Sequence, residues 1–386
     1  MKMFKKVFAA LMVVAMLFSF AACGETNYAK DNTEFVIGFS GPLTGGAAVY
    51  GVAVKNAAQM AVDEINAAGG LNGVKFKLVA TDDTHDASKV AANYATMYEG
   101  GMQVSLGTVT TAPGLEYSKL SAEDNVFFLT PSASGDDIPE NDNGYQMCFA
   151  DGNQGSVAAD YVNSLNLTKI GVFYKSDDPY SNGIYKQFKE SLDSSIEVVE
   201  AVFTGDAQDF SAQVSTLKEC TFIFMPIYYQ PASVFLTQAK DEIDANAVFY
   251  GCDGFDGLAG QFEDFSVIPQ EVSMLSHFDS NATEGAAADF IKKYTEKYGT
   301  DTLNQFGASA YDCVYAIYNA MKAAIDAGTE IDVTISASDL CEILKEQFKG
   351  GFSYSGVTGS NITWEDNGYV SKEAVKYVLK TANSAE

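Results

Sequence analysis

The stretch Phe35-Val-Ile-Gly-Phe39, followed by Ser40-Gly-Pro-Leu-Thr-Gly-Gly46, decides how this chain folds. The first five residues are apolar or small and predict a buried strand, and the next seven predict a turn-rich loop. A helix is expected from about Tyr50 to Ala68, because apolar residues recur there at helical spacing. Gly69 and Gly70 suit a helix end. This strand-loop-helix order is the repeating unit of a mostly parallel sheet covered by helices.

The same alternation recurs on both sides of residues 136–155, a segment rich in Asp, Asn and Gly that is typical of a crossing between two lobes. Further strands are expected at 75–80, 103–106, 126–129, 169–174, 197–203, 221–226, 247–250 and near 374–379. Further helices are expected at 88–99, 114–123, 184–192, 211–217, 233–243, 284–298 and 308–327. Two runs of one architecture predict two α/β lobes.

The N-terminal residues 1–22 have the pattern of a secretory leader. Three lysines precede the apolar run Val7–Phe20, which is shorter than the ~20 residues needed to span a bilayer. Ser19-Phe-Ala-Ala-Cys-Gly24 resembles a bacterial lipobox, so Cys23 is expected to carry a lipid anchor and residues 23–33 to form a tether. The alternative is an ordinary leader followed by an incidental cysteine.

The charge balance excludes one class of partner. The chain has 51 acidic and 24 basic residues, and every basic residue is a lysine, which gives a formal net charge of −27. Nucleic-acid binding needs clustered cationic side chains, so it is not expected. Because arginine is absent, a bound carboxylate would be held by hydroxyls, backbone N–H groups or lysine.

Cysteine, histidine and motif usage give no sign of catalysis. Five further cysteines are widely spaced and odd in number, which argues against a disulfide framework and predicts small buried side chains: Cys148, Cys220, Cys252, Cys313 and Cys341. Neither His85 nor His277 has a partner at metal-ligand spacing. No nucleophile elbow, P-loop or dinucleotide loop occurs. No metal, cofactor or enzymatic activity is expected.

From Phe35 onward the chain resembles the leucine/isoleucine/valine-binding protein family, the type I solute-binding proteins of ABC transporters. Nine short matches occur in the family's order: Ile37–Thr44, Glu64–Gly73, Thr81–Asp83, Leu106–Thr111, Leu129–Ser134, Phe149–Gly155, Asp209–Gln213, Gly251–Gly254 and Ser355–Gly359. Each match alone is weak, but their order behind a lipobox is specific for the family.

The resemblance implies two doubly wound lobes joined by three hinge crossings, near Asp151, at 278–280 and at 352–360. Lobe I would comprise residues 34–150 and 279–352, and lobe II residues 151–278 and 353–386. In open parallel sheets, ligands bind beyond the carboxyl ends of the strands, which here meet in the cleft between the lobes.

The resemblance also assigns binding roles. Thr111 and the loop Ser132-Ala133-Ser134 match positions that hold an amino acid's α-carboxylate. Asp253 matches the acidic residue that pairs with the α-ammonium, with Asp256 as its neighbour and competitor. Aromatic rings that line the cleft are matched by Tyr50, Tyr180 and Tyr228, with Thr110 and Tyr229 as adjacent alternatives in their segments. For the serines and threonines, capping of the following helix is the competing explanation.

The implied protein is a monomeric, lipid-anchored receptor on the outer face of the membrane or in a periplasm. It binds a small amino acid, branched-chain or otherwise neutral, and delivers it to permease subunits of an ABC transporter. A second interpretation keeps the fold but binds an amide, a urea-like compound, an aromatic acid or a dicarboxylate. A third is a ligand-sensing receptor module. An enzyme of the same fold ranks last.

Overall fold

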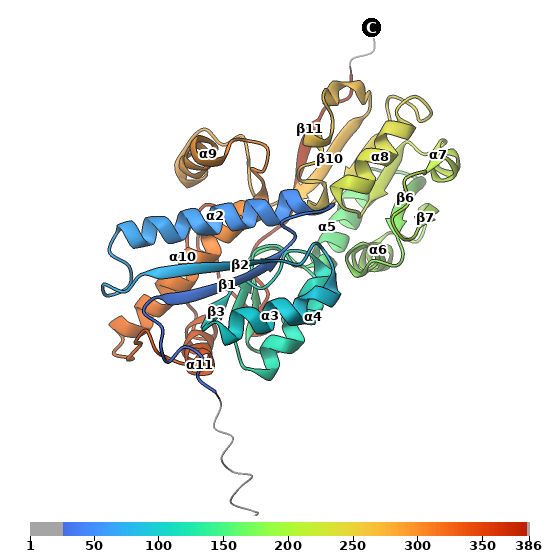
Figure 1. The fold of residues 1–386 in the computed structure, drawn as a ribbon. Helices are drawn as coiled ribbons and strands as arrows, with labels where there is room; N and C mark the ends of the chain where they lie inside the picture. The colour runs from blue at the N-terminus through green and yellow to red at the C-terminus, as the bar shows by residue number, and fades with distance from the viewer. Residues whose placement is uncertain (1–25, 384–386) are drawn as a thin grey trace, which may run out of the picture.

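The computed structural model describes residues 26–383 and shows two α/β lobes side by side (Figure 1). The leader and Cys23 lie outside the described residues. Lobe I contains a parallel sheet with the order β2-β1-β3-β4-β5. Its strands are β1 (Phe35–Gly41), β2 (Phe76–Asp82), β3 (Val104–Ser105), β4 (Phe128–Thr130) and β5 (Gly144–Gln146).

Lobe II contains a sheet with the order β11-β10-β9-β8-β6-β7, in which only β11 runs antiparallel to its neighbour. Its strands are β6 (Lys169–Lys175), β7 (Glu197–Phe203), β8 (Phe222–Met225), β9 (Val248–Gly251), β10 (Glu271–Ser276) and β11 (Val375–Lys380). Two lobes with mostly parallel sheets confirm the predicted fold class.

Helices cover both faces of each sheet, because successive side chains of a strand point to opposite faces. In lobe I, Ile37 packs with α2 (Ala48–Ala67), α10 (Gln305–Asp326) and α11 (Ala337–Lys349), whereas Val36 packs with α3 (Val90–Glu99) and α4 (Thr111–Glu123). In lobe II, Phe173 packs with α7 (Ser211–Leu217) and α8 (Tyr229–Ala239), whereas Val172 packs with α5 (Asp151–Ser164) and α6 (Pro179–Ser191). The helix α9 (Gly285–Tyr298) contacts α2.

Helix α5 corrects the prediction that residues 136–155 form only a crossing. The segment Asp151–Ser164 contains two glycines and several polar residues, a composition typical of a loop, yet it is helical. A Cβ atom on Gly155 would lie 2.5 Å from the Ile184 carbonyl oxygen of α6. The glycine therefore permits the close packing of α5 on α6. Strands β5 and β10 and helix α11 were also absent from the sequence prediction.

The third crossing comes later than the expected 352–360. The backbone N–H of Gln146, on the edge strand β5, donates to the carbonyl of Gly368, and Trp364 Nε1 donates to the Gln146 carbonyl at 2.8 Å. Residues up to Gly368 therefore still lie against lobe I, and the chain passes into lobe II only before β11 begins at Val375.

The expected tether is also shorter than predicted. The ring of Tyr28 packs edge-on against Tyr98 at 5.2 Å, and Asn27 Nδ2 donates to the Thr334 carbonyl at 2.9 Å. Asn32 Nδ2 donates to the Gly101 carbonyl at 2.9 Å. From Asn27 onward the segment is therefore docked on lobe I, although its polar composition is typical of a free linker.

Candidate ligand-binding site

The predicted site residues lie where strands end and helices begin, at the junction of the lobes. Thr111 is the first residue of α4, Tyr180 lies in the first turn of α6, and Tyr228 precedes α8. Asp253 follows β9 and Tyr50 lies in the first turn of α2. Helices α4, α6 and α8 each begin three to five residues earlier than the sequence predicted. The site residues therefore belong to helix N-termini, whose backbone dipoles favour anionic groups.

On the lobe I side, Thr111 and Ser134 meet a carboxylate that the prediction did not include. The Thr111 hydroxyl donates to Asp151 Oδ2 at 3.2 Å, and the Asp151 backbone N–H donates to the Ser134 carbonyl at 2.7 Å. All three residues are 2% exposed. Asp151 is the first residue of α5, in the segment that the sequence assigned to a crossing.

On the lobe II side, Tyr180 and Asp253 form a hydrogen-bonded pair. The Tyr180 hydroxyl donates to Asp253 Oδ1 at 2.7 Å, and the Asp253 backbone N–H donates to Gln154 Oε1 at 3.0 Å. The ring of Tyr228 stacks on that of Tyr180, with centroids 4.4 Å apart and planes 12° apart. Two of the three predicted rings and the predicted acid thus form one cluster.

Tyr50 connects the lobes. Its hydroxyl donates to the carbonyl of Gly254 at 2.5 Å and accepts the backbone N–H of Tyr229 at 3.3 Å. Its ring packs edge-on against Tyr229 and Phe306, with centroids 4.9 Å away in each case. Burial raises the pKa of the Tyr50 hydroxyl well above its ordinary value, so it stays a donor. Tyr50 contributes to the contact between the lobes as well as to the aromatic lining.

Two buried carboxyl groups dominate the electrostatics. Burial raises the pKa of Asp253 to about 6, although hydrogen bonds from Tyr180 and Gln154 lower it in part. Burial and the nearby Asp253 raise the pKa of Asp151 well above its usual range, although the Ser134 and Thr111 hydroxyls counter part of that rise. Ionising both groups together is unfavourable without a cation. A ligand ammonium would relieve this repulsion.

Other predicted residues are occupied by internal hydrogen bonds. The Ser132 hydroxyl donates to the Val109 carbonyl at 2.7 Å, and the Ala133 N–H donates to Thr130 Oγ1 at 3.0 Å. These contacts position the loop after β4. Among the alternatives, Asp256 Oδ2 accepts the backbone N–H of Gln305 at 2.9 Å, across the lobe boundary.

His85 and Gln154 were missed by sequence reasoning. His85 Nδ1 lies 2.8 Å from the Thr110 hydroxyl, and its ring packs edge-on against Tyr228 with centroids 5.3 Å apart. Gln154, in α5, has its Oε1 on the Asp253 N–H. The matched segment Phe149–Gly155 contains both Gln154 and Asp151. A helix predicted in this segment would have placed both residues near the site.

A pocket of about 480 Å³ opens beside Tyr228 between the lobes. Lobe I contributes Gly46 and His85 to its walls, and lobe II contributes Lys175 and Asp178. A space of this size suits a small ligand. It adjoins the aromatic cluster because Tyr228 lines both.

Residues 26–383 contain neither a cluster of metal-ligating side chains nor a membrane-spanning helix. No group of three or more His, Cys, Asp or Glu side chains there could hold a metal ion. No helix in that range is both long and apolar enough to cross a membrane. The five cysteines of this range are all buried and unpaired, as the sequence predicted.

With two hinged α/β lobes and a buried polar site between them, the chain has the architecture of a bilobal solute-binding protein. Residues 34–376 match the family model described as periplasmic binding protein. The chain belongs to this family, and curated relatives named Leu/Ile/Val-binding protein support the resemblance stated above. The family comprises substrate-binding proteins and implies an extracytoplasmic location.

Individual relatives agree with this assignment. The Leu/Ile/Val-binding protein BraC3 of Rhizobium johnstonii is 30% identical over 318 residues, which are 80% of this chain and 84% of that protein. The branched-chain amino acid transporter substrate-binding protein LivJ from Streptococcus pneumoniae, solved in complex with isoleucine, is 26% identical, has a TM-score of 0.76, and covers 89% of this chain and 100% of its own. A solute-binding protein from R. palustris, solved with benzoate, is 16% identical with a TM-score of 0.76, covering 91% of this chain and 95% of its own; this likeness concerns the fold.

Proposed function

We propose that this protein is the receptor of an ABC transporter for a small neutral amino acid, branched-chain ligands included. The observation that carries the proposal is the pairing, inside one buried site, of carboxyl groups with hydroxyl-bearing helix N-termini. Asp151 and Asp253 suit a ligand ammonium, whereas the hydroxyl of Thr111 and the N-terminus of α4 suit a ligand carboxylate. An α-amino acid carries both groups on adjacent atoms.

The proposed ligand side chain lies against the rings of Tyr180 and Tyr228. These rings supply a large apolar surface, and tyrosine combines such surface with one polar hydroxyl. Isoleucine is the ligand in the LivJ structure from Streptococcus pneumoniae, which supports an aliphatic side chain for this chain. Residues Tyr50, Ser132, Ala133 and Ser134 complete the proposed site, with the loop of the last three on the side of the ligand carboxylate.

A second candidate ligand is an amide or a dicarboxylate. The pocket beside Tyr228 has polar walls that include His85 and Lys175. A ligand side chain that reached this space could be hydrogen-bonded there. This alternative keeps the fold and changes the ligand, and for a ligand without an ammonium group Asp253 would lose its proposed role.

The remaining parts of the proposal concern location and partners. Cys23 carries a lipid anchor in place of a transmembrane helix, and the docked segment from Asn27 keeps lobe I close to the membrane. Residues 34–150 and 279–352 act as one rigid lobe and 151–278 as the other, and the chain works as a monomer with permease subunits. The protein binds its ligand and delivers it to the permease without changing it chemically.

A thermal-shift screen of the mature protein against the twenty amino acids, urea, acetamide, benzoate and succinate tests the proposal. A ligand that binds only the folded state raises the unfolding temperature by mass action. We expect the largest shifts from aliphatic amino acids. Shifts produced only by compounds without an ammonium group would contradict the role of Asp253, and turnover of any stabilising ligand would contradict a pure binding function.

A further inference from the structure

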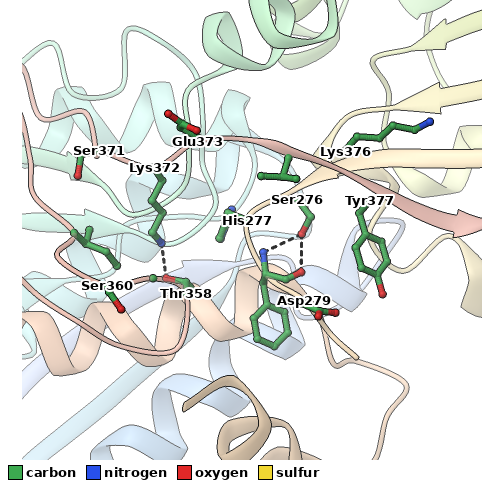
Figure 2. Close-up of a pocket in the computed structure, with 14 residues that line it drawn as sticks. Ser276, His277, Asp279, Thr358, Ser360, Ser371, Lys372, Glu373, Lys376 and Tyr377 are labelled. Atoms are coloured by element: carbon green, nitrogen blue, oxygen red, sulfur yellow. Dashed lines mark hydrogen bonds between the residues drawn. The ribbon is translucent and has the colours of Figure 1, made fainter. Parts of the chain in front are cut away.

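A second pocket, of about 410 Å³, lies at the hinge (Figure 2). One wall is the second crossing, Ser276–Asp279. The other combines the loop Thr358–Ser360 with residues of the third crossing and the start of β11, namely Ser371–Glu373 and Val375–Tyr377. The pocket shares none of the residues predicted for the interlobe site. Its walls are the segments that must move when the lobes open or close.

Lys372 is the unusual group in this pocket. Its Nζ donates to the Thr358 hydroxyl oxygen at 2.5 Å, and Figure 2 shows the side chain directed inward toward Thr358. An ammonium group has three donors. No ion pair in residues 26–383 involves Lys372, so this cation has no direct counter-ion there.

The closest acidic partner in this network, Asp312, is already saturated. Its Oδ2 accepts the Thr358 hydroxyl at 2.6 Å and the Thr358 N–H at 2.7 Å, and its Oδ1 accepts the Val357 N–H at 2.8 Å and the Tyr354 hydroxyl at 3.0 Å. Thr358 thus stands between the carboxylate and the ammonium. Asp312 anchors the loop and leaves Lys372 free to bind an anion.

Lys376, four residues further along the chain, also lines this pocket, but its ammonium group has an acidic partner. Its Nζ lies 2.9 Å from Glu271 Oε1 and 2.8 Å from the Tyr161 hydroxyl. That pairing raises the pKa of Lys376, whereas burial lowers the pKa of Lys372 to about 8. An anion beside Lys372 would reverse that destabilisation of its charged form.

The rest of the lining defines the shape of the ligand. Ser360 and Ser371 line the pocket on the same side as Lys372, and Phe278, Ile362 and Val375 supply an apolar part of the lining. The lining also includes the carboxyl groups of Asp279 and Glu373, so a bound anion has to sit at the Lys372 end. Val375 is 61% exposed, although it is a large apolar residue. A polar, cationic end next to an apolar end is complementary to a small carboxylate with a short hydrocarbon tail.

We propose that the hinge pocket binds a small aliphatic carboxylate, with the Lys372 ammonium as its counter-ion and the apolar wall around its tail. Because both crossings line the pocket, a bound carboxylate favours the present arrangement of the hinge, in which the lobes are in contact. Binding at the hinge and binding in the cleft are therefore coupled, and each must strengthen the other by the same factor.

Isovalerate is a suitable probe, because it has the carboxylate and the branched tail but no ammonium. Calorimetry on the full mature chain is expected to show that Lys372→Met weakens isovalerate binding at least tenfold, whereas Lys380→Met, at the end of β11 and outside the pocket, changes it less than twofold. Thr111→Val alters the interlobe site and not the hinge pocket, so it is the control for isovalerate bound at the interlobe site. Loss of isovalerate binding in Thr111→Val with no change in Lys372→Met would overturn the proposal.

Two further measurements use the wild-type protein and so do not depend on how the variants fold. Isovalerate is expected to raise the titration midpoint of the Lys372 ε-methylene carbon in NMR, and an unshifted midpoint would contradict the proposed contact. Chloride or phosphate that displaced isovalerate at equal concentration would show an inorganic-anion site and overturn the carboxylate assignment.

The coupling is tested with leucine and rests on the proposed function. Saturating isovalerate is expected to raise leucine affinity at least threefold, because a hinge ligand favours closure. A lowered or unchanged affinity would contradict the coupling. If neither leucine nor any other neutral amino acid binds, the proposed function fails, while the Lys372 titration still decides the hinge site.

Discussion

The buried carboxyl group of Asp253 makes ligand affinity depend on pH in a direction that can be worked out. Burial raises its pKa to about 6 in the free protein. A ligand ammonium favours the ionised carboxylate, so the pKa falls when the ligand binds. Binding then releases a proton below that pH, and affinity is full above about pH 6 and is lost as the pH falls through it.

The magnitude follows from the same pKa. At pH 7 about nine-tenths of Asp253 is ionised and at pH 5 about one-tenth, so affinity for an amino acid should be about tenfold weaker at pH 5, or about 1.4 kcal/mol. Calorimetry at both pH values measures this directly. The ammonium and carboxylate of a free amino acid keep their charges over this range.

Two variants assign the effect. Asp253→Asn should bind weakly, and its affinity should change less between pH 5 and 7 than that of the wild type; any dependence that is left comes from Asp151. Asp256→Asn should keep the pH dependence, because Asp256, whose pKa burial also raises to about 6, accepts the Gln305 N–H and lies outside the proposed ammonium contact. A flat wild-type profile, or an unchanged slope in Asp253→Asn, would refute the reasoning.

Three further predictions concern stability and location. Tyr50→Phe removes the hydroxyl that donates to the Gly254 carbonyl at 2.5 Å and should lower the free energy of unfolding by about 1–2 kcal/mol in urea titrations, whereas Tyr28→Phe, at a ring that is 39% exposed, should have little effect. Gly155→Ala should cost about 1–3 kcal/mol because its Cβ would lie 2.5 Å from the Ile184 carbonyl oxygen, whereas Gly183→Ala, with no atom closer than 4.0 Å, should be neutral or stabilising; similar effects of the two would contradict the packing argument. Cys23→Ser should move the protein from the membrane to the soluble fraction, and a variant that stays membrane-bound would disprove the anchor.

Periodicity located several of the strands and helices closely. The strands β1, β6 and β7 and the helix α2 fall within two residues of their predicted bounds. Periodicity failed for α5, because its glycines and polar residues are typical of a loop. In the structure Gly155 permits close packing on α6, and the polar residues of α5 lie at the candidate site. Local composition cannot distinguish a glycine required by a neighbouring helix from one required by a turn.

The candidate site was predictable only in part, for a similar reason. Thr111 and Asp253 follow strands in matched segments, and Tyr180 follows the predicted strand at 169–174, so their positions could be inferred from the chain order. Asp151 could not, because its role depends on a contact with Thr111, 40 residues earlier in the sequence. The late third crossing likewise depends on the hydrogen bond between Gln146 and Gly368, which no local pattern records.

The most direct test of the account is calorimetry on wild-type protein and Asp253→Asn, each with the amino acid that gives the largest thermal shift and with its 2-hydroxy analogue. The substitution keeps the shape of the side chain and removes its charge. It should weaken the amino acid by about 1.5–3 kcal/mol, roughly ten- to a hundredfold or somewhat more, and leave the hydroxy acid nearly unchanged. Equal losses for both ligands, or no loss for either, would contradict the claim that Asp253 holds a ligand ammonium in the interlobe site.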